Sequence, residues 1–171
     1  IEQEGTYNLP EAQLDRFLMY VKIGYPDIDS ERQILKLIQG EEKKQIISTP
    51  DPITQKTIFD ARSEVLNVYT SPELEAYIIQ LIMATRNPAP YDKKLIPLIR
   101  FGASPRGTIA LDICTKANAW LNGRDFVTPS DIQAVANDVL QHRIITSFEA
   151  KTEHISSEDI IGMLLERVPL P

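Results

Sequence analysis

Residues 104–140 read SPRGTIALDICTKANAWLNGRDFVTPSDIQAVANDVL and predict two consecutive α-helices. Ser104-Pro105 is a helix start signal, because serine caps the first turn and proline fits the first helical position. Asn122-Gly123 ends this helix, and Thr128-Pro129 with Asp131 starts the next one. The short connection between the two helices predicts a helical hairpin.

Apolar spacing assigns a buried face to each helix of this hairpin. In the first helix the spacing predicts a buried face of Ile109, Ile113, Ala117 and Trp120. In the second helix it predicts Ile132, Val135, Ala136 and Val139.

Helical spacing continues on both sides of the hairpin. Two helices are predicted before Ser71: one is capped by Ser30 and Gln33 and ends at Gly40, and the next carries Ile58, Ala61, Val65 and Val68. A third runs from Ser71-Pro72 to near Arg86. A last capped helix carries Ile160, Ile161, Leu164 and Leu165. The proline-containing stretches Lys43 to Pro52 and Asn87 to Tyr91 predict loops.

Strand-like composition is confined to three short segments. Phe17 to Ile23 is predicted to be a β-strand that follows one helical turn in PEAQLDRF, residues 10–17. Leu95 to Phe101 predicts a small strand or an extended connector, and Arg143 to Phe148 a short β-like stretch. A lone strand in the front half cannot bury both faces, so we expect its partners to lie before Ile1. The predicted fold class is mainly α.

The amino-acid composition favours some classes of protein and disfavours others. The 171 residues are 43% hydrophobic, which supports a packed core. Lys and Arg total 18 against 24 Asp and Glu, which disfavours a nucleic-acid partner. The single cysteine, Cys114, suits a reducing compartment and predicts a cytoplasmic protein without a zinc site of the usual kind. No apolar run reaches the roughly 20 residues of a membrane span.

The chain begins at Ile1 and its first residues lack the features of a signal peptide. We therefore expect it to start within a longer protein. None of the seven glycines lies in a G-x-x-x-x-G-K-[ST] loop, so tight ATP binding by this chain alone is not expected. His142 and His154 lack metal-ligand spacing and are expected to be ordinary surface or cap residues.

Arg106 occupies the first turn of the helix that Ser104-Pro105 opens, where a cation opposes the positive end of the helix dipole. A phosphate would offset this repulsion, so residues 102–107 could form half of a phosphate site. Spacing alone favours the simpler interpretation that Arg106 is a surface arginine paired with a carboxylate. Likewise, spacing alone predicts that Arg16 is a surface residue bridged to Glu11 or Asp15.

Three segments in the same order, IEQEGTYNLPEAQLDRFLMYVKIGYP at 1–26, GASPRG at 102–107 and GRDFVTPSDIQAVANDVLQHRI at 123–144, resemble the MoxR family of AAA+ ATPases. The resemblance covers nearly the whole chain. It implies that residues 1–26 are the C-terminal remnant of an AAA+ α/β core, contributing a short helix and a β-strand. It implies that residues 27–171 form the AAA+ helical lid domain.

The same resemblance implies the site residues. Arg16 would be the arginine finger, a catalytic residue that reaches the γ-phosphate of ATP in the neighbouring subunit. Arg106, with Ser104 and Pro105, would be the sensor-2 segment that contacts nucleotide within its own subunit. The family's Walker A lysine, Walker B acidic pair and sensor-1 asparagine have no counterparts here. ATP, Mg²⁺ and hydrolysis would therefore belong to the intact protein, and no metal ligand is expected in this chain.

The resemblance further implies a ring, expected to be hexameric, that remodels other proteins in a chaperone-like way. It also implies partners with von Willebrand factor A domains. Two alternatives remain open at this point: a stand-alone helical adaptor that binds another protein without nucleotide, and the lid of a related AAA+ branch such as the magnesium-chelatase motor subunit.

Overall fold

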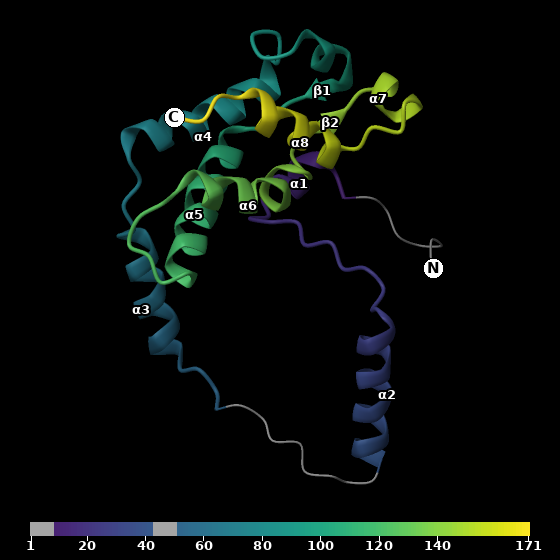
Figure 1. Cartoon of the computed structure of the whole chain (residues 1–171), viewed down its shortest axis with the longest axis vertical. Helices are drawn as coiled ribbons and strands as arrows, with labels where there is room; N and C mark the ends of the chain where they lie inside the picture. The colour runs from purple at the N-terminus through teal and green to yellow at the C-terminus, as the bar shows by residue number, and fades with distance from the viewer. Residues whose placement is uncertain (1–8, 43–50) are drawn as a thin grey trace.

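The computed structural model describes residues 9–42 and 51–171 (Figure 1). The segment Ile1 to Tyr7, and all of the predicted loop from Lys43 to Pro52 except its last two residues, lie outside that part. The described elements are α1 (Glu11–Leu14), α2 (Ile28–Glu42), α3 (Gln55–Leu66), α4 (Pro72–Arg86), the 3-10 helix η1 (Lys93–Leu98), β1 (Ile99–Phe101), α5 (Pro105–Leu121), α6 (Pro129–Leu140), β2 (Ile145–Thr146), α7 (Phe148–Thr152) and α8 (Ser157–Arg167). The prediction of a mainly α fold is confirmed.

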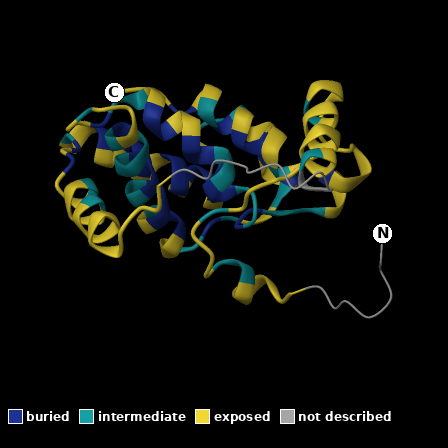
Figure 2. Ribbon diagram, turned by 90° about the horizontal axis from the view of Figure 1, so that it is seen from below, coloured by how far each residue is buried: buried dark blue, intermediate teal, exposed yellow. Residues whose placement is uncertain are grey.

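A helical body of α4, α5, α6 and α8 contains the core. α5 and α6 pack against each other as the predicted hairpin, α4 packs on α5, and α8 packs on both α4 and α6. Figure 2 shows the buried residues gathered within this body. The four residues predicted to form the buried face of α6, Ile132, Val135, Ala136 and Val139, are all buried. Removing such side chains from water is the main driving force for the fold.

Side-chain caps begin the helices of the body at the predicted positions. Ser71 accepts a hydrogen bond from the backbone of α4, and Thr128 and Asp131 form a capping box on α6. Ser156 and Asp159 form a second capping box on α8. These caps satisfy N–H groups that have no partner within their own helix.

The buried face predicted for α5 is wrong. Ile109 is 62% exposed, and the buried positions are Gly107, Ala110, Leu111, Cys114, Thr115 and Ala119. α5 is contacted by α3, α4 and α6, so helices cover several of its sides at once. Small side chains at the contacts let these helices approach closely, and a prediction from the largest apolar residues misses such a face.

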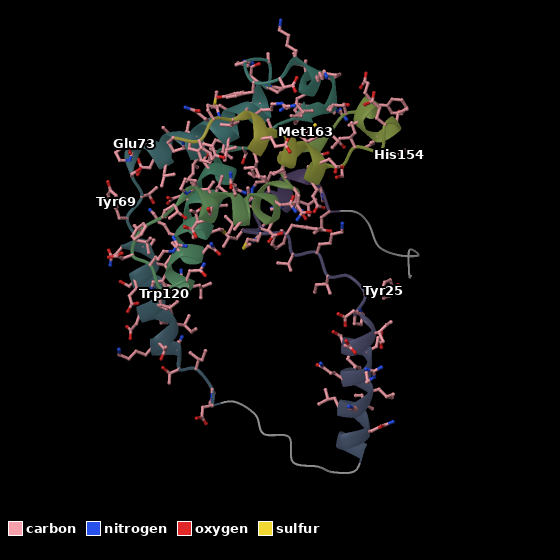
Figure 3. All side chains as sticks on the ribbon, viewed as in Figure 1. Tyr25, Tyr69, Glu73, Trp120, His154 and Met163 are labelled. Carbon is pink, nitrogen blue, oxygen red and sulfur yellow. The ribbon has the colours of Figure 1, made fainter. Side chains whose placement is uncertain are left out.

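α3 lies against the end of α5. The Trp120 indole N–H donates a hydrogen bond to Glu64 over 2.8 Å, and Figure 3 shows Trp120 on the side of α5 that faces α3. α3 and α4 confirm the predicted helices, although Val68 lies beyond the end of α3.

The predicted boundaries of α2 are wrong. The helix begins at Ile28, and the carboxylate of Asp27 accepts the hydrogen bond from the Ser30 N–H over 2.8 Å, so Asp27 rather than Ser30 caps it. The helix continues through Gly40, because glycine inside an exposed helix costs only about 1 kcal/mol. Its apolar residues Ile34, Leu35, Leu37 and Ile38 are about half exposed, and Figure 1 shows α2 apart from the helical body.

The strand predicted at Phe17 to Ile23 does not form. The segment is irregular, with bends at Phe17 and Leu18, and no backbone ladder pairs with it among the described residues. Its polar groups instead contact residues at the end of α6: the Tyr20 N–H donates to the Asp138 carbonyl over 2.8 Å, and the Gln141 amide donates to the Tyr20 carbonyl over 3.1 Å. Backbone polar groups need partners, and here partners other than a neighbouring strand supply them.

The other two strand-like segments pair with each other. Leu95 to Phe101 divides into η1 and β1, and β1 pairs antiparallel with β2, with Ile99 opposite Thr146 and Phe101 opposite Ile145. The short helix α7 was not predicted. Within the described residues, no helix is long and apolar enough to cross a membrane.

Candidate functional site

The N-terminus of α5 is built as the sequence predicts. Ser104 is the N-cap, and its hydroxyl oxygen accepts a hydrogen bond from the Arg106 N–H over 3.1 Å. Pro105 occupies the first helical position, and Arg106 is exposed in the first turn of this 17-residue helix. The start of α5 therefore presents a guanidinium beside backbone N–H groups that favour an anion.

The loop before α5 is held against the end of α4. The Ala103 N–H donates to the Thr85 hydroxyl over 3.0 Å, and the Arg86 Nε–H donates to the Ala103 carbonyl over 2.7 Å. A Cβ added at Gly102 would lie 2.4 Å from the Thr85 carbonyl oxygen. Glycine is required here by this close approach of two backbones.

A Gly102→Ala variant is expected to lower the free energy of unfolding by about 1–3 kcal/mol, because the added methyl group displaces backbone that cannot rotate away. Urea denaturation followed by circular dichroism measures the change. Gly24→Ala is the matched control: an added Cβ at Gly24 meets nothing within 4 Å, so stability should stay within about 0.5 kcal/mol. Equal stability of both variants would contradict the close approach.

Asp15 joins the two segments that carry the predicted arginines. The Ser104 hydroxyl donates to the Asp15 carboxylate, with oxygen–oxygen distances of 2.8 and 3.0 Å. The prediction that Asp15 or Glu11 bridges Arg16 is wrong: no ion pair of Arg16 is found among the described residues, where its guanidinium carbon lies 6.0 Å from the centre of the Phe17 ring. Asp15 instead faces Ser104 and Arg143, because its side chain points toward α5.

Both predicted arginines line one pocket of about 190 Å³, which is formed by Asp15, Arg16, Leu18, Arg106, Ile109, Ala110 and Arg143. Its lining contains three guanidinium groups and one carboxylate. Ion pairing of Arg106 with a carboxylate, the simpler interpretation from spacing, is not found in the described ranges 9–42 and 51–171. The Arg143 guanidinium is buried and donates to backbone carbonyls, so Arg16 and Arg106 are the two that remain to bind an anion such as phosphate.

Arg143 is the pocket residue that sequence reasoning missed, because it lay in a stretch interpreted as β-like. Its side chain is 2% exposed, and its Nε lies 3.4 Å from Asp15 Oδ1. Burial lowers the pKa of the guanidinium, and the neighbouring Asp15 carboxylate opposes that shift. Its position just after a predicted helix could have identified it, because a basic residue there can bind the last carbonyl groups of that helix.

The two histidines differ in their surroundings. His154 is exposed with φ 57°, and it follows the end of α7, as expected for a cap residue (Figure 3). His142 is not an ordinary surface residue: it is half-buried, its Nε2 lies 3.1 Å from the Phe17 carbonyl oxygen, and burial lowers its pKa. No group of three or more metal-ligating side chains is found in the described part of the chain.

Comparison with known proteins finds a domain and several relatives. Residues 97–162 match the AAA lid domain. Along its full length the chain is similar to the uncharacterised protein YeaC of Bacillus subtilis at 40% identity, covering 50% of that protein. It is 36% identical to chaperone MoxR1 of Mycobacterium tuberculosis, covering 45% of it, and 30% identical to protein MoxR of Methylorubrum extorquens, covering 53%.

A solved structure agrees with these relatives. The chain matches a crystal structure from Cytophaga hutchinsonii, assigned provisionally as an ATPase, with a TM-score of 0.91 and 40% identity. The match covers 100% of this chain and 52% of that one. The chain thus spans about half the length of the relatives it matches.

Proposed function

We propose that the chain is the C-terminal portion of a MoxR-type AAA+ ATPase that couples ATP hydrolysis to chaperone-like remodelling of other proteins, because it matches the AAA lid domain and resembles proteins named MoxR along its full length. In this proposal Arg16 is the arginine finger and Arg106, with Ser104 and Pro105, is the sensor-2 segment. Residues 1–26 belong to the end of the AAA+ core and residues 27–171 to the lid.

Two exposed arginines that form no ion pair among the described residues, Arg16 and Arg106, carry the proposal, because each can reach a phosphate group. The two residues are 90 positions apart in the sequence, and the bond between Ser104 and Asp15 brings their segments together. A guanidinium that reaches a transferred phosphoryl group offsets the negative charge that develops there, and such an arginine accelerates well-studied nucleotide hydrolases roughly 10³- to 10⁵-fold.

The complete protein would bind ATP and Mg²⁺ through residues outside this chain and would act as an oligomer, which we propose is a hexameric ring in the cytoplasm. Proteins with von Willebrand factor A domains are the proposed partners. The acidic composition, with 24 acidic and 18 basic residues, favours protein partners over nucleic acid.

Titration of this chain with inorganic phosphate, followed by NMR, tests the anion site. We expect weak binding with a Kd of about 1 mM. Arg16→Ala or Arg106→Ala should weaken it by about 10-fold or more, since hydrogen bonds to charged groups contribute about 1.5–3 kcal/mol.

Arg100→Ala is the control, since Arg100 is an exposed arginine on β1 that does not line the pocket. It should leave the affinity for phosphate unchanged. An equal loss of affinity in Arg100→Ala would mean that phosphate binds to arginines in general, and the proposed site would be wrong.

A further inference from the structure

Arg143 is a charged side chain buried among backbone carbonyl groups. Its Nη1 donates to the carbonyls of Val139 and, over 3.2 Å, Leu18. Its Nη2 donates to the carbonyl of Phe17 and, over 3.2 Å, to that of Asp15. Burying a charge is unfavourable unless it is paired and hydrogen-bonded, and here both terminal nitrogens have partners.

These carbonyls flank Arg16 on both sides in the sequence. The segment from Asp15 to Leu18 belongs to no strand, and its described backbone contacts lie with α1 and with residues at the end of α6. One guanidinium therefore binds the backbone immediately before and immediately after the proposed arginine finger. Hydrogen bonds to α1 and the contacts of Arg143 together hold the backbone on either side of Arg16.

The other side of Arg143 faces the start of α5. Its Nε lies 3.4 Å from Asp15 Oδ1, and the same carboxylate accepts the hydrogen bond of Ser104, the residue that caps α5. A Cβ added at Gly107 would lie 3.4 Å from Arg143 Cδ, so the arginine passes close to the first turn of α5. A continuous series of contacts thus joins Arg143, Asp15 and Ser104 to the turn that carries Arg106.

We propose that Arg143 is a positioning residue that fixes residues 15–18 to α5 and α6, so that Arg16 and the lid helices move as one rigid unit. The orientation of the lid in one subunit would then set the position of the finger at the site that Arg16 serves. This inference rests on the proposed function of Arg16, and it adds a mechanism by which the lid controls that function.

Hydrogen exchange in this chain tests the attachment directly. The Tyr20 N–H, which donates to Asp138, should exchange about 10-fold faster or more in Arg143→Met, while the core amides of α8 keep their protection. Arg143→Lys should behave in the same way, because a single ammonium cannot replace a fork that binds four carbonyls. The lysine variant also preserves the test if Arg143→Met fails to fold.

Arg100→Met is the control. Arg100 is an exposed arginine on β1 that forms no ion pair among the described residues and lies outside the segment 15–20. It should leave Tyr20 exchange unchanged. Unchanged Tyr20 exchange in both Arg143 variants would overturn the proposal whatever the ATPase activity shows.

ATP turnover by the complete protein tests the positioning role. Arg143→Met should lower kcat about 10²-fold, the loss expected when a catalytic group is misplaced by about 1 Å, while KM for ATP changes less than about 3-fold. In an Arg16→Ala background the same substitution should cause no further loss, because the finger it positions is absent.

Two results separate failure of the inference from failure of the proposed function. If Arg143→Met and Arg16→Ala lower kcat by factors that multiply, Arg143 acts independently of the finger and the inference is wrong. If Arg16→Ala itself keeps full kcat, the proposed function of Arg16 is wrong and the positioning role falls with it, even if Tyr20 exchange shows the attachment.

Discussion

An Arg16→Ala variant of the complete protein is expected to hydrolyse ATP about 10³-fold more slowly than the unaltered protein. Arg16 is exposed and forms no ion pair among the described residues, so its removal should leave the fold and the thermal stability unchanged. The loss would come from charge on the transferred phosphoryl group that is no longer neutralised. Steady-state measurement of phosphate release gives kcat directly.

Arg62→Ala is a matched control for this prediction. Arg62 is an exposed arginine whose guanidinium lies 6.0 Å from the Phe59 ring centre, the same contact that Arg16 makes with Phe17. Its removal should leave kcat unchanged. A stand-alone adaptor, the alternative class of function, predicts instead that Arg16→Ala is tolerated as well.

The shared pocket makes a double variant informative. The resemblance assigns Arg16 and Arg106 to nucleotides of different subunits, whereas both side chains line one pocket. If they contact the same phosphate, the Arg16→Ala and Arg106→Ala losses should be non-additive, because the first removal already breaks the joint interaction. Additive losses would support separate nucleotides.

Replacing Asp131 by alanine should lower the free energy of unfolding by about 2–3 kcal/mol, through loss of the helix cap and of hydrogen bonds to a charged group. Asp131 is 2% exposed, and its carboxylate accepts two hydrogen bonds from Arg124 at 2.6 Å, two from Thr128 at 2.7 and 2.8 Å, and one from Asn118 at 2.8 Å. The variant loses the capping box of α6 and leaves the Arg124 guanidinium without its counter-charge. Urea denaturation measures the change.

Asp60→Ala provides the contrast. Its ion pair with Lys56 at 2.6 Å lies on the exposed surface of α3, where such pairs contribute about 0.5 kcal/mol or less. If Asp131→Ala were as mild as Asp60→Ala, the network around the start of α6 would not stabilise the fold as described.

The Asp131 carboxylate should also make the stability of the chain depend on pH. The Arg124 guanidinium, with Thr128 and Asn118, holds the pKa of Asp131 far below its usual value. A depressed pKa in the folded state contributes stability above the unfolded pKa of about 3.9, and this contribution is lost as the pH falls below that value. Between about pH 4 and pH 2 the unaltered chain should therefore lose stability more steeply than Asp131→Asn. If the stability of both proteins fell equally with pH, the lowered pKa of Asp131 would be contradicted.

Local signals in the sequence were sufficient for most of the helices. Ser71-Pro72, Ser104-Pro105 and Thr128-Pro129 each predict a helix start that the structure confirms, because capping depends on residues only three positions apart. The resemblance to the MoxR family, stated from three segments, is confirmed by the lid domain and the relatives. The roles of Arg16 and Arg106 stay predictions.

Two kinds of feature depended on neighbours that are distant in the sequence. The face of α5 that is buried depends on where α3, α4 and α6 pack, so the large apolar residues did not identify it. Phe17 to Ile23 has the composition of a strand, but no strand lies beside it in the described residues, and groups at the end of α6 bind its backbone instead. β-propensity is overridden by such surroundings.

The sequence by itself determined the helix starts, the mainly α class, the resemblance to the MoxR family, and the two arginines as candidate site residues. Only the tertiary structure decided that Arg16 and Arg106 share a pocket, and that Asp15 and buried Arg143 connect them. The physical reason is the separation of the residues along the sequence. Helix caps and apolar stripes involve residues within one or two helical turns of each other. The bonds of Asp15 to Ser104 and to Arg143 instead join residues 89 and 128 positions apart, and only the packed fold brings these together.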